Sequence, residues 1–366
     1  MKKTQNAPTD LGVAFFPSAE VLSANPYWLI LASELEKAGV SFKHNTPSSF
    51  NFMWLLKNRN QIRILNLHFI QQFYKSSSFF RKFVKLILFA FYLVFARLIG
   101  YITVFTLHNL EPTYPVKPAW FDYTGHWLAS ILSTRVIVYC SEAKKLLAER
   151  YGRRRDIYFV DHPNVIKYYP NSISKEDART KLGLPYNTIV FLFIGGVRPN
   201  KGVELLIQAF KQLHDENLRL VIAGSIFPPE SYVQSLKDLA IADPRIIFFT
   251  NYIPDNEMQI YLNASDMVVL PFTRILTSGT ANLAMSFGKP VIVPRIGCLP
   301  ELVESPNYGW TFESENIESL KDAMQTAMAS DLTLIGKNAY EKISMFTPEG
   351  FARDTSKAYL GKAFLA

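Results

Sequence analysis

The second half of the chain alternates between short apolar, β-branched runs and segments with helical spacing. This alternation is typical of βαβ units, which build a parallel sheet with helices on both faces. It therefore predicts a doubly wound α/β domain. The expected strands are residues 188–194, 219–223, 246–250, 267–270 and 291–293, and the expected helices between them are 203–213, 231–240, 256–263 and 281–287.

The first half shows the same alternation at longer intervals. Its expected strands are 12–16, 41–44, 63–68, 101–106, 135–139 and 157–160, with helices at 27–38 and 142–151 and a long hydrophobic helix beginning at residue 79. Residues 166–174 are polar, contain a proline and lack periodicity, which predicts a linker. The expected domains are therefore 1–168 and 169–347, with the helical segment 348–366 packing back on the first domain.

The two halves differ in charge. Residues 1–170 carry 21 Lys and Arg against 10 Asp and Glu, whereas the remainder carries 18 against 21. Such an excess indicates that the first half meets an anionic partner, such as a membrane surface or a lipid phosphate; a solvated basic face is the alternative. No nucleic-acid partner is expected, because no RNA- or DNA-binding motif is present and the aromatic residues fall in apolar runs.

The most hydrophobic segment, residues 79–105, is expected to form a helix and then a strand. Its uninterrupted apolar core is about half of the ~20 residues that a membrane-spanning helix requires. Basic residues at its start and many aromatic side chains favour a helix lying in a bilayer interface; a buried core helix is the alternative. With no secretory signal and with Cys140 and Cys298 interpreted as free thiols, the expected location is cytoplasmic, peripheral on the inner face of the cytoplasmic membrane.

Two loops of the second half combine features of an anion site. The turn Thr277-Ser278-Gly279-Thr280 opens a helix, so backbone N–H groups and the positive end of the helix dipole face a ligand there. The loop GGVRPNKG at 195–202 follows a strand, and its Arg198 and Lys201 can compensate a diphosphate without a metal. The loop is neither a P-loop nor GxGxxG, and an ordinary loop with solvated basic residues is the alternative.

The series GGxRxxKG, SDxVVLP, glycine turn, GKPVI and GCxPELV resembles the C-terminal domain of GT-B glycosyltransferases, especially the family 4-like group. The resemblance implies an α/β GT-B fold, with two Rossmann-like doubly wound domains facing a cleft and a C-terminal helix crossing back. It also implies a metal-independent transferase whose co-substrate is a GDP- or UDP-linked sugar, with no other cofactor. The donor diphosphate would be bound by Gly196, Arg198, Lys201, Ser278, Gly279 and Thr280.

One departure from the family concerns its acidic residues. Family 4 members carry two glutamates in EGFGxxxLEA, whereas this chain reads ILTSGTANLA, with Ile275 and Leu283 at both acidic positions. The variant is similar to transferases that assemble bacterial exopolysaccharide repeat units on a lipid carrier, among them inverting β-mannosyl and glucuronosyl transferases. We therefore expect inverting transfer of a hexose-type sugar to a lipid-pyrophosphate-linked or polysaccharide-precursor acceptor. The alternatives are a retaining family 4-like enzyme, a GT-B sugar-nucleotide epimerase and a catalytically degenerate GT-B scaffold.

Inversion requires a general base near the acceptor. The acceptor is expected on the first half of the chain, which we call the acceptor half, and acids are few there. Glu111, in the loop after strand 101–106, is the predicted base, and Asp122 and Asp10 are weaker candidates. His108 matches a family histidine near the donor sugar and would contact a sugar hydroxyl or orient the base. The alternatives are a solvated surface role for Glu111 and a buried core imidazole for His108.

Further site residues follow from the resemblance and from their places after strands. Tyr252 and Ile253 are expected near the nucleotide base, and Asn282 and Glu301 near the ribose. Alternatives are a packing role for Tyr252 and a helix-dipole role for Glu301. In the acceptor half, His162 and Asn25 are expected at the cleft, with turn capping as the alternative for His162.

Overall fold

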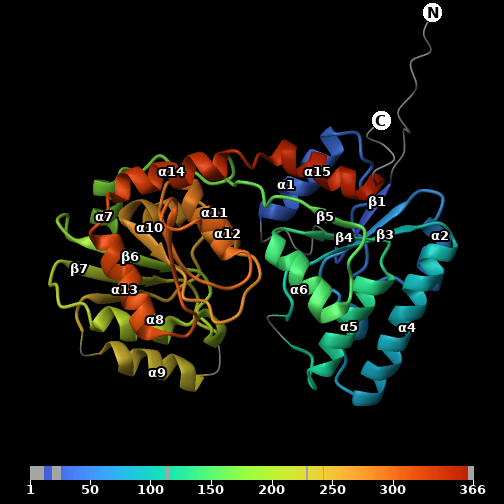
Figure 1. The fold of residues 1–366 in the computed structure, drawn as a ribbon, viewed down its shortest axis with the longest axis horizontal. Coiled ribbons are helices and arrows are strands. Elements are labelled where there is room, and N and C mark those ends of the chain that lie inside the picture. Colours follow the sequence, from blue (N-terminus) through green and yellow to red (C-terminus); the bar gives the residue numbers. More distant parts are fainter. Residues whose placement is uncertain (1–11, 19–25, 113–114, 228–229, 242, 362–366) are drawn as a thin grey trace, which may run out of the picture. The chain divides into compact units, whose positions relative to one another are not determined.

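The chain forms two compact units, and the computed structural model describes residues 12–18, 26–112, 115–227, 230–241 and 243–361. Unit 1 comprises Met1–Pro163 with Thr347–Ala366, and unit 2 comprises Asn164–Phe346. Each unit contains one parallel sheet covered by helices on both faces (Figure 1). The predicted fold class, two doubly wound α/β units, is confirmed.

The sheet of unit 1 has the strand order β1-β2-β3-β4-β5, and all neighbours are parallel. Residues 41–44, expected to be a strand, form a single bridge between Phe42 and Val13, since the chain turns at Asn45 with a φ of 52°. The chain thus passes from β1 outward to Phe42 and returns to β2, so the winding reverses there. The strands are β1 Val13–Phe16, β2 Ile64–Leu67, β3 Ile102–Thr106, β4 Arg135–Val138 and β5 Ile157–Phe159.

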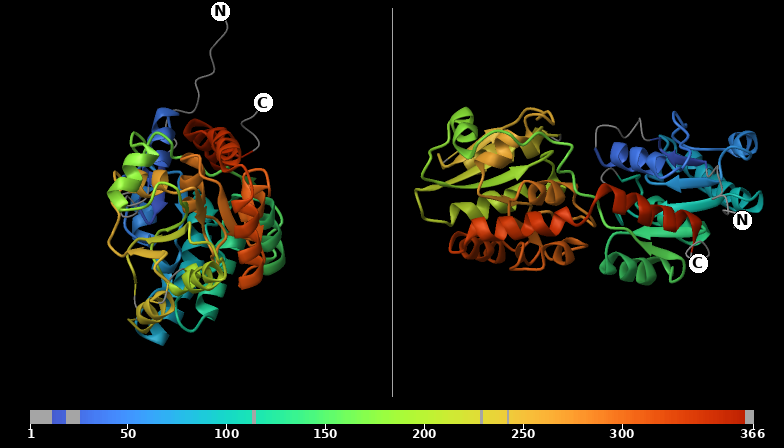
Figure 2. Two further views of the ribbon diagram at one scale, coloured as in Figure 1. Left: turned by 90° about the vertical axis from the view of Figure 1, so that its left-hand side faces the viewer. Right: turned by 90° about the horizontal axis from the view of Figure 1, so that it is seen from above.

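Helices cover both faces of this sheet. The helices are α1 Pro26–Lys37, α2 Phe52–Asn58, α3 Gln71–Tyr74, α4 Phe79–Leu98, α5 Trp120–Leu132, α6 Ser141–Tyr151 and α15 Pro348–Leu360. The last of these, α15, packs beside α1, as Figure 2 shows from above, whereas α4, α5 and α6 cover the other face. We did not predict α2, α3 or α5. In α5, glycine and aromatic residues weaken helix propensity, and packing against α4 and α6 holds the helix instead.

The hydrophobic segment 79–105 folds as predicted into a helix and a strand. Helix α4 ends at Leu98, Gly100 takes a left-handed φ of 96°, and β3 begins at Ile102. Within the described ranges, no helix combines the length and the apolar character needed to cross a membrane.

The cysteines differ from expectation. Cys140 precedes α6, and its Sγ accepts the N–H of Ala143 at 3.3 Å. Among the described residues none is a free cysteine, so the prediction of free thiols is wrong. The number and spacing of cysteines in a sequence do not report the state of their thiols, and the compartment inferred from free thiols loses this support.

The sheet of unit 2 has the order β11-β10-β9-β6-β7-β8, again with all neighbours parallel. Helices α8, α9 and α13 pack on one face, and α10, α11 and α14 lie on the other (Figure 1). The five predicted strands are confirmed as β6 to β10, whereas β11 was not predicted. The strands are β6 Ile189–Ile194, β7 Leu218–Ala223, β8 Ile246–Phe249, β9 Met267–Val269, β10 Val291–Pro294 and β11 Gly309–Phe312. The helices are α7 Lys175–Leu182, η1 Pro199–Lys201, α8 Val203–Lys211, α9 Glu230–Ala240, α10 Met258–Ala264, α11 Gly279–Ser286, α12 Leu299–Val303, α13 Ile317–Met328 and α14 Leu332–Ser344.

Candidate functional site

The winding of unit 2 reverses between β6 and β9. The chain moves from β6 to β7 and β8 on one side, and then from β9 to β10 and β11 on the other. In open parallel sheets, ligands bind beyond the carboxyl ends of the strands at such a switch point. The loops after β6 and β9 are the two predicted anion loops, so the strand order brings them to one place.

Direct contacts join these two loops. The backbone N–H of Thr273 donates to the carbonyl oxygen of Asn200 at 3.2 Å. Gly202 has a φ of +64°, and a Cβ built there would lie 2.0 Å from the Pro271 oxygen. A Cβ on Gly195 would lie 4.0 Å from Thr280 Oγ1. The close approach at Gly202 thus requires glycine, and the predicted diphosphate residues of both loops become neighbours.

The two cations of the site lie over aromatic rings. The Arg198 guanidinium carbon is 4.0 Å from the ring centre of Phe227, and Lys201 Nζ is 4.1 Å from that of Phe272. Burial, aided by the positive charge of Arg198, lowers the pKa of Lys201 to about 8. Two adjacent, partly desolvated cations repel each other, so an anion placed between them would be bound strongly.

The start of α11 supplies the backbone part of the site. Ser278 is the N-cap, and its Oγ accepts the N–H of Ala281 at 3.1 Å. Gly279 follows in open space, because a Cβ there would meet nothing within 4 Å. The hydroxyl of Ser278 therefore stabilises the helix end, and the N–H groups of Gly279 and Thr280 are left to face a ligand.

The predicted nucleoside residues lie in different settings around unit 2. Tyr252 follows β8 and is 71% exposed, whereas the adjacent Ile253 is buried. Asn282 is buried within α11, and Glu301 is exposed in the first turn of α12. Leu283, at one of the acidic positions of family 4, belongs to the core. Their burial and their positions in the fold alone do not assign these residues a role.

The sheet edge of unit 1 carries a different set of side chains. His68 directly follows β2, His108 lies just past β3, and Tyr139 directly follows β4. His68 Nδ1 is 3.1 Å from His108 Nε2, and His108 Nδ1 is 3.3 Å from the Tyr139 hydroxyl. That hydroxyl is 2.7 Å from the hydroxyl of Tyr27 on α1. We call these four residues the imidazole–phenol network.

The imidazole–phenol network is neutral at physiological pH. Burial, with a smaller contribution from His162, lowers the pKa of His108 to about 3, and burial holds the pKa of His68 well below its usual range. Burial also raises the pKa of Tyr139 and Tyr27. Both ring nitrogens of His108 lie within the network, while His68 Nε2 is buried without a hydrogen-bond partner.

The remaining acceptor-half candidates are not all near this network. The ring of His162 packs 5.0 Å from that of Tyr27, and burial lowers the pKa of His162 to about 4. Glu111 is exposed and forms an ion pair with Arg150 at 3.1 Å. Asp122 is buried, and accepts hydrogen bonds from the Tyr74 hydroxyl and the Val116 N–H. Asn25 and Asp10 lie outside the described residues.

Sequence reasoning missed three members of the imidazole–phenol network, namely His68, Tyr139 and Tyr27. A signal was present for two of them. His68 and Tyr139 are polar residues at the ends of apolar strands, the pattern that led us to the loops of unit 2. Tyr27 does not lie at the end of an apolar strand. It lies on α1, and only the packing of that helix brings its hydroxyl to Tyr139.

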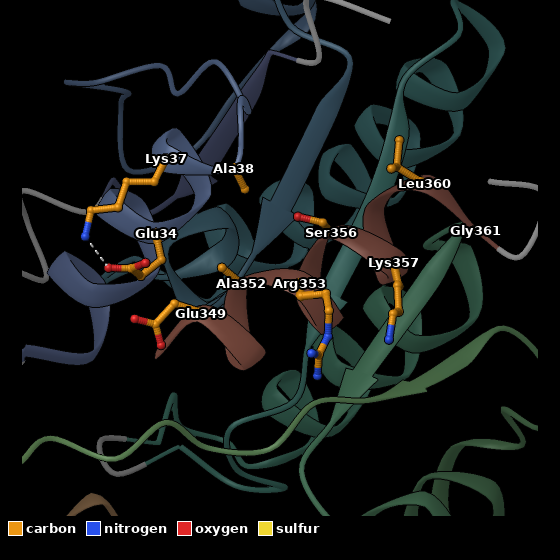
Figure 3. Close-up of a pocket in the computed structure, with 10 residues that line it drawn as sticks. All are labelled: Glu34, Lys37, Ala38, Glu349, Ala352, Arg353, Ser356, Lys357, Leu360 and Gly361. Carbon is orange, nitrogen blue, oxygen red and sulfur yellow. Dashed lines mark hydrogen bonds and ion pairs between the residues drawn. The ribbon is translucent and has the colours of Figure 1, made fainter. Parts of the chain in front are cut away.

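A separate groove lies on unit 1 between α1 and α15 and has a volume of about 620 Å³. Figure 3 shows side chains of both signs around it, and Lys37 pairs with Glu34 at 2.6 Å. None of the sheet-edge residues lines the groove. Because its charges include both signs and its glutamate at position 34 is paired, it offers no convergent set of groups for catalysis.

Comparison with solved structures defines the class of the fold. The structure of HepE from Anabaena in complex with UDP and glucose matches with a TM-score of 0.71 at 18% identity, covering 96% of this chain and 100% of that one. The fold is therefore GT-B. Residues 174–342, which lie within unit 2, match the family described as glycosyl transferases group 1.

Curated relatives are similar to the chain over part of their length. D-inositol 3-phosphate glycosyltransferase from Corynebacterium glutamicum (strain R) is 29% identical over 197 residues, 52% of this chain and 47% of the relative. GDP-mannose:glycolipid 4-beta-D-mannosyltransferase from Xanthomonas campestris pv. campestris is 33% identical over 122 residues, 33% of this chain and 34% of the relative. The chain thus spans about half or less of the length of these relatives.

Proposed function

We propose that the protein transfers a hexose-type sugar from a nucleoside diphosphate sugar to a lipid-linked or polysaccharide-precursor acceptor. The observation that carries the proposal is the meeting of the Arg198–Lys201 loop with the start of α11 at the switch point of unit 2. Two cations and a helix N-terminus at one strand edge form a site for a diphosphate.

The chemistry follows from where charge develops. The acceptor oxygen attacks the anomeric carbon, the bond from that carbon to the diphosphate oxygen breaks, and its electron pair stays on the diphosphate. Arg198, Lys201 and the N–H groups of Gly279 and Thr280 stabilise the growing negative charge. These groups supply the positive charge that a metal ion would otherwise supply, so the proposed reaction is metal-independent.

The acceptor proton goes to a base on unit 1. We propose Glu111 for this role, in an inverting reaction, after its ion pair with Arg150 opens. His108 is proposed to act through the imidazole–phenol network, and His162 and Asn25 to line the acceptor side. Tyr252, Ile253, Asn282 and Glu301 are proposed to hold the nucleoside, and Gly196 and Ser278 to shape the diphosphate loops.

The donor and acceptor classes are proposed from the relatives. The HepE structure contains UDP, and the Xanthomonas relative is named for GDP-mannose and a glycolipid. We therefore propose a UDP- or GDP-linked hexose as donor and a lipid-pyrophosphate-linked glycan as acceptor, in bacterial exopolysaccharide assembly. The expected location is the cytoplasmic side of the membrane, with peripheral contact through unit 1.

A nucleotide screen tests the proposal. UDP, GDP and ADP, and separately the corresponding nucleotide sugars, are added to the purified protein. The unfolding temperature and the calorimetric affinity are recorded for each. At least one nucleoside diphosphate should stabilise the protein, Arg198→Ala should abolish the shift, and Lys337→Ala, an exposed residue on α14, should keep it. The proposal fails if no nucleotide binds. Binding without turnover across the donor panel would instead favour a degenerate scaffold, and product NMR distinguishes inversion from retention.

A further inference from the structure

Helix α4 presents apolar side chains to solvent as well as to the core. Leu86, Phe89, Leu93 and Ala96 are buried on its inner side. On the outer side, apolar residues recur at alternating spacings of four and three: Phe80, Val84, Ile87, Phe91, Val94 and Leu98, all exposed. A surface helix of a soluble domain normally turns polar residues outward, so this outer stripe implies a partner.

Neighbouring helices extend the apolar surface. Trp120, Tyr123 and Trp127 recur along α5 and are each 40–44% exposed. The ring of Phe79 on α4 lies 6.3 Å from that of Trp120, so the two stripes meet at the starts of their helices. Helix α2, which packs against α4, adds exposed Met53 and Leu56. We call the exposed apolar residues of these three helices the outer surface; Figure 1 shows α4 and α5 side by side.

The charged side chains on α2 and α4 are of one sign. Between Glu36 and Glu111 the sequence contains no Asp or Glu, whereas α4 alone contains Arg81, Lys82, Lys85 and Arg97. Lys82 Nζ donates to the carbonyl oxygen of Lys117 at 2.6 Å, and Lys85 Nζ to that of Lys75 at 3.1 Å. These bonds fix the ammonium groups without neutralising them, so a positive rim flanks the apolar stripes.

We propose that the outer surface docks unit 1 on an anionic lipid bilayer, with α4 lying in the plane of the interface. A 20-residue helix is ~30 Å long, and none in the described ranges can span a membrane, which favours the in-plane arrangement. The exposed Trp and Tyr side chains on α5 suit the headgroup region, and the basic rim suits anionic lipid. This docking rests on the membrane contact proposed above. It specifies that the outer surface of unit 1 makes the contact and that the bilayer contains anionic lipid.

Vesicle flotation tests this inference with the full chain. Vesicles of phosphatidylcholine alone are compared with vesicles in which about a third of the lipid is phosphatidylglycerol. The protein should bind the anionic vesicles at least about tenfold more tightly. Phe80→Ser with Phe91→Ser, and separately Arg81→Gln with Lys85→Gln, should each reduce that binding by about tenfold or more. Leu334→Ser with Lys337→Gln, matched exposed changes on α14, should leave it unchanged.

Two outcomes would overturn the inference. One is equal vesicle binding by the Phe80 and Phe91 variant and the parent. The other is a dimer in lipid-free light scattering that dissociates in the same variant, because the outer surface would then pair with a second copy. Calorimetric nucleotide binding of each variant is measured alongside. A variant that still binds nucleotide but no longer binds vesicles supports the membrane surface. If the parent protein binds no nucleotide, only the transferase proposal is contradicted.

Discussion

The two units share one architecture and place charge differently on it. In unit 2, Arg198 and Lys201 lie at the strand edge where the winding reverses, each over an aromatic ring. In unit 1, the corresponding edge carries the neutral imidazole–phenol network, and uncompensated basic residues lie on α4. The contrast shows that the topology of a parallel sheet determines where a ligand binds. The residues that follow each strand determine the charge of that binding site.

The largest expected effect tests the charged side of this comparison. Replacing Arg198 or Lys201 with Ala should reduce kcat by about 10²–10³, because each removes a group that is proposed to stabilise the departing diphosphate. Steady-state kinetics with the best donor of the screen give the number, and circular dichroism checks the fold. Near-normal turnover in both variants would remove the diphosphate assignment, and Lys337→Ala serves as the control.

Two glycines at the same strand edge are expected to affect different properties, one the stability of unit 2 and the other the binding of nucleotide. Gly202→Ala should destabilise unit 2 by about 2–4 kcal/mol, because the added Cβ meets the Pro271 oxygen and φ is left-handed. Gly279→Ala should change stability by less than about 1 kcal/mol, since its Cβ meets nothing, yet it should weaken nucleotide binding where phosphate approaches the backbone. Urea unfolding and calorimetry measure the two effects. A Gly279→Ala protein that binds as the parent does would place the diphosphate away from α11.

The neutral side of the comparison predicts a pH dependence. His108 and His162 have folded pKa values of about 3 and 4, while an unfolded histidine titrates near ~6.5. The unfolded chain therefore binds more protons below pH ~6.5, and each imidazole lowers the free energy of unfolding by up to ~1.4 kcal/mol per pH unit as the pH falls towards 4. Stability above pH ~6.5 is unaffected.

Denaturant unfolding between pH 7.5 and 4.5 measures this slope. In His108→Gln the fall should be shallower by up to ~1.4 kcal/mol per pH unit. Parallel curves for the parent and the His108 variant would contradict the neutral network.

The smallest effect concerns the hydroxyl that links two members of the imidazole–phenol network. Tyr139→Phe should destabilise the protein by about 1–2 kcal/mol, because Tyr27 and His108 both lose a partner. Nucleotide affinity should stay at the parental value, since the network belongs to unit 1. Thermal unfolding and calorimetry on the same preparation provide both readings. A stability equal to that of the parent would mean that water replaces the hydroxyl.

Much of unit 2 could be predicted from the sequence because its signals are local. Alternating strands and helices, the glycines of 195–202 and the Ser278 turn each lie within a short window, and the structure has the strands and the cap where the pattern indicated. In unit 1, weak helix formers concealed α5, and residues 41–44 had the composition of a strand but only one bridge. Packing and a single turn decided those cases.

The sequence by itself determined two parallel sheets, the residues at their strand ends and a long amphiphilic segment at 79–98. Only the tertiary structure decided which strand ends are neighbours, and hence that His68 meets His108 and that Gly202 lies against Pro271. Likewise, only packing on α2 and α5 decided which side of α4 is buried and which apolar side remains outside. The physical reason is that strand order and helix packing join residues far apart in the chain, which no local pattern encodes.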